Sequence, residues 1–312
     1  MDSARTTQWI QFLDKNLPHN ADVIADLLMT DGEGRRRYPM ASTLFWQSWA
    51  RVDAKGGLAF ILREQDSDKR AFEMATLMKA WVVVDPVGAA GGFAALEGSP
   101  LAPSALMGMA NGFSGSSNAA ATDFATWLPD KLRSEAAATI AGRQMLLLKI
   151  DGAQAWFDAL PSHTGPFYRR EALRAVLAKM SPVCIPGTVE KFVTQRLNEP
   201  WSHSPAEQIV AASAILSSGG SPWDYVSKVI GKYPNRENPL ELVVAVADLD
   251  FQSAITWVNA HPGDPASDTI LAGAVFIRRQ RGMLEEAAAL RERIRDPALR
   301  DLAEGKQVVE ER

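Results

Sequence analysis

The chain has 312 residues, of which 46% are hydrophobic and 22% charged, a composition typical of folded proteins that argues against extensive disorder. Its formal net charge of −4 excludes nucleic acid as the default partner, because phosphate backbones attract basic surfaces. The single cysteine, Cys184, excludes an intramolecular disulfide and lies in an apolar run, so we expect a buried, inert thiol.

No apolar stretch has the length of a membrane-spanning helix, and the first nine residues contain no apolar signal core. We therefore expect no membrane insertion. Two localisations stay open: the cytoplasm, or export after removal of a leader.

Apolar residues recur at three- and four-residue spacing along almost the whole chain, and alanine is abundant, which predicts helices nearly throughout. Gly, Pro and Ser/Asn/Asp clusters divide the pattern into segments of about ten to eighteen residues. The predicted helices form six successive pairs: Ser104–Gly112 with Ala119–Leu128, Leu132–Ile150 with Ala153–Leu160, Phe167–Lys179 with Val189–Leu197, Ala206–Leu216 with Trp223–Lys232, Leu240–Ala247 with Phe251–Ala260, and Thr269–Gln280 with Leu284–Ile294.

Two short patterns repeat within this series. Trp49-x-x-x-Asp53 recurs as Trp81-x-x-x-Asp85, each followed by small residues, and a recurrence at this interval is typical of stacked helical hairpins. We expect such aspartates, with Asp250 before Trp257, to cap the next helix. A second template places a small residue before an aromatic one and then a proline: Ala121-x-x-Phe124-x-x-x-x-Pro129, Ala153-x-x-Trp156-x-x-x-x-Pro161 and Ala254-x-x-Trp257-x-x-x-x-Pro262. We expect these aromatic rings to pack in the core and the prolines to end the helices.

Over residues 40 to 300 the chain resembles the tetratricopeptide-like and HEAT-like α-solenoid repeat proteins, with divergent repeats of about 28 to 39 residues. The last unit, residues 273–294 with its Gly282 turn and its alanines at 287–289, is the most similar. The resemblance implies an all-α fold, a right-handed α-α superhelix of stacked antiparallel helix pairs. It further implies one domain over residues 1–312 with about seven or eight hairpins, an N-terminal cap at 1–38 and a C-terminal capping helix and tail at 283–312.

Motifs for enzyme chemistry are weak. The histidines, His19, His163, His203 and His261, are far apart, and none belongs to a metal-binding motif. The Gly112–Ser116 string lacks the last glycine of a nucleophile elbow, and Gly88–Gly92 lacks the spacing of a nucleotide-binding loop, so we interpret them as a turn and as close helix packing. We expect no cofactor.

Acidic residues leave one enzymatic alternative open. Asp248 and Asp250, with Glu237 and Glu241 upstream, could serve as general acid and base or hold a divalent cation. A capping role for Asp250 is the preferred interpretation.

Six residues that depart from the repeat templates are the candidate partner-binding set. Trp201 and Trp223 lie in or beside Pro/Ser-rich turns, so we expect them to be exposed. Tyr168, Arg169, Arg170 and Arg174 could form a basic, aromatic patch, because Arg170 and Arg174 are one helical turn apart. The basic runs at Arg35–Arg37 and Arg278–Arg281 are interpreted as a solvated loop and a helix end.

The sequence thus favours a non-catalytic scaffold that binds a protein or peptide, of unknown identity, in a groove built from successive repeats. Two alternatives remain: an enzyme with a superhelical scaffold around an acidic active site, and the docking or sensor region of a larger exported protein.

Overall fold

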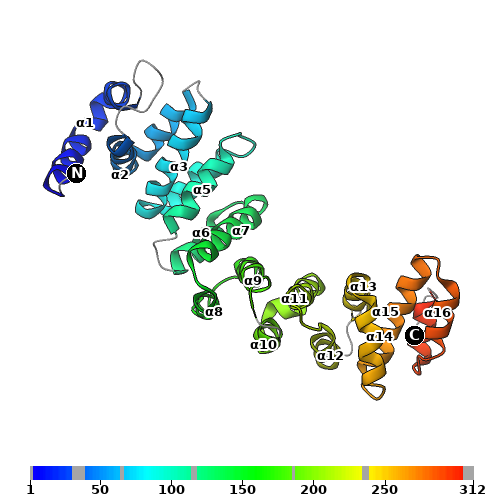
Figure 1. Cartoon of the computed structure of the whole chain (residues 1–312). Helices are drawn as coiled ribbons and strands as arrows, with labels where there is room; N and C mark the ends of the chain where they lie inside the picture. Colours follow the sequence, from blue (N-terminus) through cyan, green and yellow to red (C-terminus); the bar gives the residue numbers. More distant parts are fainter. Residues whose placement is uncertain are drawn as a thin grey trace. The chain divides into compact units, whose positions relative to one another are not determined.

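The computed structural model describes residues 3–29, 39–63, 67–113, 118–184, 187–233 and 239–304. Every regular element in these ranges is a helix, which confirms the predicted all-α class (Figure 1). Among the described residues, no helix has both the length and the hydrophobicity needed to cross a bilayer. The chain divides into two compact units, 1–175 and 176–312.

The first unit contains the helices up to α9, which continues past the unit boundary. Their bounds are α1 (Ser3–Met29), α2 (Pro39–Arg63), α3 (Ser67–Val84), α4 (Pro86–Ala94), α5 (Ala102–Phe113), α6 (Asn118–Trp127), α7 (Asp130–Leu147), α8 (Ile150–Asp158) and α9 (Pro166–Met180). Two of them are bent: α1 at Asn20, and α2 at Asp53, where two helices meet.

The second unit contains the remaining helices. Their bounds are α10 (Thr188–Thr194), the 3-10 helix η1 (Pro200–His203), α11 (Pro205–Ser217), α12 (Trp223–Lys232), α13 (Pro239–Leu249), α14 (Phe251–Ala260), α15 (Ala266–Gln280), α16 (Leu284–Arg291) and α17 (Pro297–Ala303). All twelve helices of the six predicted pairs are present. The expected C-terminal capping helix is divided into α16, which ends at Arg291, and α17, which begins at Pro297 after the Asp296 cap.

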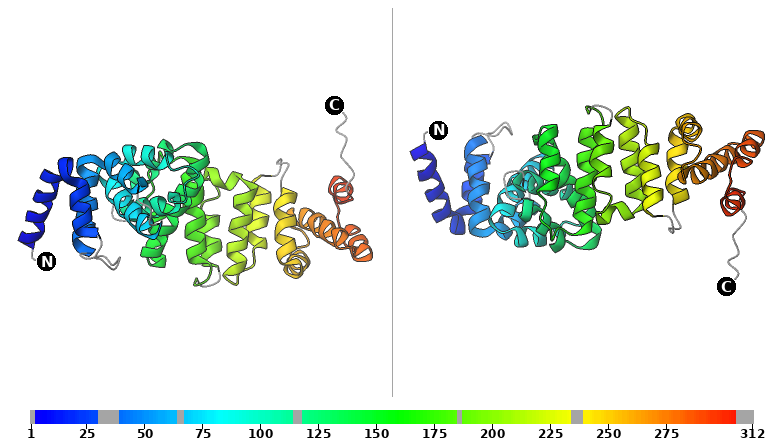
Figure 2. Two further views of the ribbon diagram at one scale, coloured as in Figure 1. Left: turned by 90° about the horizontal axis from the view of Figure 1, so that it is seen from above. Right: turned by 90° about the horizontal axis from the view of Figure 1, so that it is seen from below.

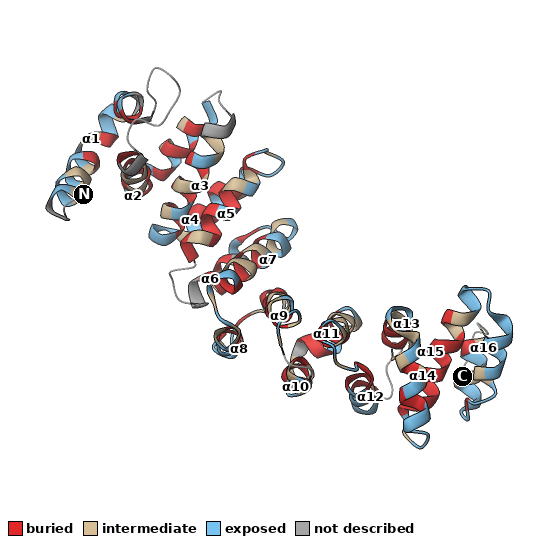
Figure 3. Ribbon diagram, viewed as in Figure 1, coloured by how far each residue is buried: buried red, intermediate tan, exposed pale blue. Residues whose placement is uncertain are grey.

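Within each unit most neighbouring helices are next but one in the sequence, and the consecutive helices α2 and α3 also pack side by side. In the first unit α2, α3, α5 and α7 form one row, in which each helix contacts the next, while α4 contacts α6. In the second unit α11, α13 and α15 form one row, and α10, α12 and α14 another (Figure 2). Buried residues concentrate where the helices of a unit face one another (Figure 3).

Single aspartates form the corner between several pairs of consecutive helices. Asp53, Asp85 and Asp250 have φ between −156° and −144° and ψ between 76° and 84°, so one residue reverses the chain. Each side chain accepts a hydrogen bond from the backbone N–H three residues later, at 2.9, 2.9 and 3.2 Å. These bonds satisfy amides that the first helical turn leaves unpaired. The predicted helix caps are confirmed.

The aromatic template also behaves as predicted. Phe124, Trp156 and Trp257 are buried, the alanines three residues before them are buried, and each proline follows the end of its helix. In the last predicted repeat, residues 273–294, Gly282 has φ +74°, the left-handed conformation that glycine tolerates best. Of the three alanines at 287–289, only Ala287 is buried.

Glycines bring α5 into direct contact with the backbone of α3. A Cβ atom at Gly108 would lie 2.2 Å from the carbonyl oxygen of Ala75, and one at Gly112 would lie 2.7 Å from that of Lys79. In α4, a Cβ atom at Gly92 would lie 2.5 Å from the Trp81 ring, which confirms close packing as the role of this glycine. These glycines therefore hold α3 and α5 at a separation that larger residues could not reach.

We expect Asp85→Ala to lower the free energy of unfolding by about 1 kcal/mol, the typical cost of a lost N-cap. Asp85→Asn is the matched control, because asparagine caps a helix as well as aspartate does and we expect it to retain most of the stability. Urea denaturation followed by circular dichroism measures both. Equal losses in the two variants would show that the cap is not the source of the effect.

We expect Gly108→Ala to destabilise the protein by about 1–3 kcal/mol, because overpacking against α3 outweighs the gain in helix propensity. Gly142→Ala in the interior of α7 is the control, since a Cβ atom there meets nothing within 4 Å. It should stabilise the protein by up to about 1 kcal/mol. Thermal denaturation of the two variants compares them, and a stabilising Gly108→Ala would contradict the close contact.

Candidate functional site

Tyr168 is buried in α9, contrary to the expectation of an accessible aromatic residue. Its side chain is 2% exposed, and burial raises the pKa of the hydroxyl well above its usual value, so the hydroxyl stays neutral. The neighbouring Arg169 donates from Nη2 to the carbonyl oxygen of Pro161 at 3.2 Å, which ties α9 to the loop that precedes it. Tyr168 therefore contributes to the core of the first unit and not to an outer patch.

Arg170 and Arg174 surround the buried carboxylate of Glu171, which is 5% exposed. Arg170 Nε lies 3.6 Å and Arg174 Nη1 3.4 Å from Glu171 Oε1, and Ser134 Oγ of α7 donates to the same oxygen at 3.4 Å. The Arg170 guanidinium also lies over the Phe167 ring, 4.5 Å from its centroid. A buried carboxylate requires such partners, so both arginines have a structural role. Their partly exposed heads leave partner binding a prediction.

Trp201 and Trp223 are both buried, so the expectation of exposed rings is wrong. Trp201 is 4% exposed, in the 3-10 helix η1, which packs on α11. Trp223 is fully buried at the start of α12, where its Nε1 donates to Ser253 Oγ of α14 at 2.8 Å. A Pro/Ser-rich turn places each ring against the next helices, and local composition alone does not show this.

The acids of the enzymatic alternative have structural partners. Asp248 forms an exposed ion pair with Arg281 at 2.6 Å, and Asp250 caps α14. Glu241 is exposed, and Glu237 lies outside the described residues. No observation in the described part of the chain favours an acidic active site.

The other polar candidates are also accounted for by local structure. The four histidines are exposed, and among the described residues no three metal-ligating side chains come together. Arg278 pairs with Glu286 at 3.1 Å and lies over the Phe251 ring, and Arg279 donates to a backbone carbonyl of α17. The Arg35–Arg37 run lies outside the described residues, and Cys184 is partly exposed where burial was expected.

A groove between α2 and α3 is the site that the structure points to. Its volume is about 450 Å³. On α2 the lining residues lie four positions apart, and on α3 they follow one face of the helix. The lining residues are Thr43, Gln47 and Arg51 of α2 and Phe72, Thr76, Lys79, Ala80, Val83 and Val84 of α3.

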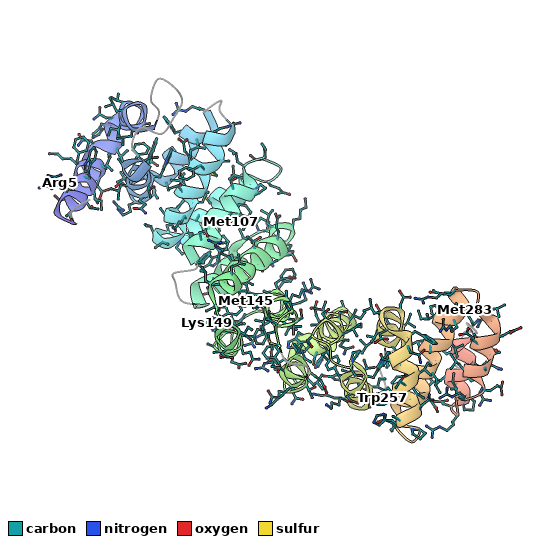
Figure 4. All side chains as sticks on the ribbon, viewed as in Figure 1. Arg5, Met107, Met145, Lys149, Trp257 and Met283 are labelled. Atoms are coloured by element: carbon teal, nitrogen blue, oxygen red, sulfur yellow. The ribbon has the colours of Figure 1, made fainter. Side chains whose placement is uncertain are left out.

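The groove combines exposed apolar surface with positive charge. Phe72, near one end of the groove, is 39% exposed, and Val83 and Val84, near the other end, are 64% and 51% exposed. Arg51 forms an ion pair with Asp14 of α1 at 2.8 Å. Lys79 is exposed and has no ion-pair partner among the described residues, so the groove carries one unbalanced cation. The neighbouring helix α5 also exposes an apolar side chain, Met107 (Figure 4).

Sequence reasoning did not find the groove. Its residues are of ordinary types, and the only local signal is the spacing Thr43-x-x-x-Gln47-x-x-x-Arg51 on one helix and Phe72-x-x-x-Thr76-x-x-x-Ala80 on the next. Such spacing places residues on one face of a helix but does not say whether that face is buried.

The chain was compared with protein-family models, with curated proteins and with solved structures, and nothing matched in any of the three comparisons. The likeness to α-solenoid repeat proteins therefore rests on the residue pattern alone.

We expect Glu171→Ala to lower the free energy of unfolding by about 1–3 kcal/mol, because it leaves two partly buried arginines without their acid. We expect a value in the lower part of this range, because solvent reaches both arginine heads and screens their attraction to the Glu171 carboxylate. Arg174→Ala should cost less, because Arg170 and Ser134 still contact the carboxylate. Urea denaturation of both variants checks the order, and an equal or larger loss for Arg174→Ala would contradict it.

Proposed function

We propose that the chain is a non-catalytic scaffold that binds a segment of a protein or peptide in the groove between α2 and α3. The single observation that supports this function most is the groove itself, which is lined by three exposed apolar side chains and by a lysine that has no ion-pair partner in the described part of the chain. Monomeric proteins seldom leave such surface open unless a ligand or partner covers it. A protein segment matches its mixed apolar and polar lining.

The rows of helices support a more specific architecture for the scaffold. We propose that they are the two layers of an α-solenoid, a right-handed α-α superhelix of tetratricopeptide-like or HEAT-like hairpins. In both units helices next but one in the sequence pack side by side, and the same aspartate corner occurs in both. Such proteins gain stability from neighbour contacts and display side chains from several repeats on one face.

Exposed apolar side chains at the end of α3 can be changed without disturbing the core. Val83→Gln with Val84→Gln removes apolar surface from the groove, adds no charge and keeps good helix formers. Leu146→Gln with Leu147→Gln is the matched control, because these residues are similarly exposed at the end of α7 and lie outside the groove lining.

Peptides selected from a random display library against the whole chain provide the test. Fluorescence polarisation should show that the groove variant binds them at least about tenfold more weakly than the unchanged chain, since roughly 1.4 kcal/mol of apolar contact is lost. The control variant should bind them unchanged. Selected peptides that bind the groove variant equally well, or the absence of any selected peptide, would contradict the proposed function.

A further inference from the structure

We propose that the occupant of the α2–α3 groove is an amphipathic helix of a partner protein, with acidic residues along one edge of its apolar face. This inference rests on the proposed function and adds the conformation and the charge of the partner. Three observations carry it: the helical walls of the groove, the spacing of its side chains and its charge.

Most of each wall offers side chains but no free backbone groups to pair with a peptide. Along residues 43–47 and 72–80 the amides and carbonyls of α2 and α3 pair inside their own helices, and free carbonyls occur only toward the end of α3. An extended peptide would bury backbone groups there without partners, whereas a helix satisfies its own. Helix-in-groove binding, with anchors at spacings of three and four residues, is therefore the mode that fits.

The side-chain relief also matches a helix. Thr43, Gln47 and Arg51 form one ridge at four-residue spacing, and ridges of this kind interlock with those of another helix. On α3 the small residues Thr76 and Ala80 separate Phe72 from the two valines, which leaves a depression for larger side chains of the partner. From residue 72 to residue 84 the lined face is about 18 Å long, or roughly three helical turns.

The charge of the groove selects an acidic edge. None of the nine lining residues that the structure describes is acidic, although the whole chain has a net charge of −4. Asp14 already pairs with Arg51, which leaves Lys79 as the cation that a partner carboxylate can contact. An acid opposite an exposed lysine adds modest affinity, but a base at the same place is repelled, so Lys79 acts mainly on specificity.

The experiment reverses this charge. A display library of amphipathic peptides of about 15 residues, or four helical turns, carries fixed leucines on one face and a mixture of Glu, Gln and Lys along both edges. Selection against the unchanged chain should enrich Glu along one edge. Selection against Lys79→Glu should enrich Lys along that same edge, and the Glu-edged peptides should bind this variant about tenfold more weakly.

Lys149→Glu is the matched control, because Lys149 is an exposed lysine outside the groove and the substitution changes the net charge equally (Figure 4). This variant should enrich the same Glu-edged peptides as the unchanged chain. Raising the salt concentration should weaken the binding of the Glu-edged peptides more than that of the other peptides. Circular dichroism of each variant confirms that it is folded.

The outcomes separate this inference from the proposed function. One outcome is that selection against the unchanged chain and against Lys79→Glu enriches the same edge residues, while the selected peptides bind the Val83→Gln, Val84→Gln variant more weakly. This outcome would overturn the acidic edge but would still support binding in the groove. A fully random library that yields groove binders with central prolines would overturn the helical partner. Peptides that bind the Val83→Gln, Val84→Gln variant as tightly as they bind the unchanged chain would overturn both proposals.

Discussion

The aspartate-capped corner is the contact on which the arrangement of the helices depends. Asp85 is the only residue between α3 and α4, so the direction of the second helix follows from one pair of dihedral angles and one hydrogen bond. Because Asp53 and Asp250 adopt nearly the same conformation, the chain repeats the same reversal in both units. A longer loop would cost more conformational entropy and would let the second helix take several directions.

The corner also explains the small residues that follow it. A Cβ atom at Gly88 would lie 2.0 Å from Asp85 Oδ2, and one at Gly56 2.1 Å from Asp53 Oδ2, so glycine lets the cap approach closely. At the third corner this position is Ser253, and its cap bond is longer, at 3.2 Å. The Trp-x-x-x-Asp pattern is thus part of a local unit in which the tryptophan packs on glycines of the next helix, as Trp81 does on Gly92.

Features set by neighbours in the sequence could be predicted, and features set by distant residues could not. The caps at Asp53 and Asp250 and the buried aromatics of the template depend on residues within one or two turns, so the sequence pattern predicted them. Trp223 is fully buried and donates a hydrogen bond to Ser253, thirty residues away, and no local signal shows this. The groove forms only where two helices of ordinary composition lie side by side, and the sequence pattern of either helix alone does not indicate it.

Positions counted back from the corner aspartate connect the repeat to the groove. Two residues before the aspartate stand Arg51 and Val83, both of which line the groove, and Asp248 in the second unit, which pairs with Arg281. Six residues before it stand Gln47, Lys79 and Val244, of which the first two line the groove. The corner thus brings the same positions to the surface of the groove in successive repeats, while their chemistry differs from one repeat to the next. Because a change in the residues that build the corner costs stability, the proposed specificity for a partner would be determined at the positions that this template leaves free.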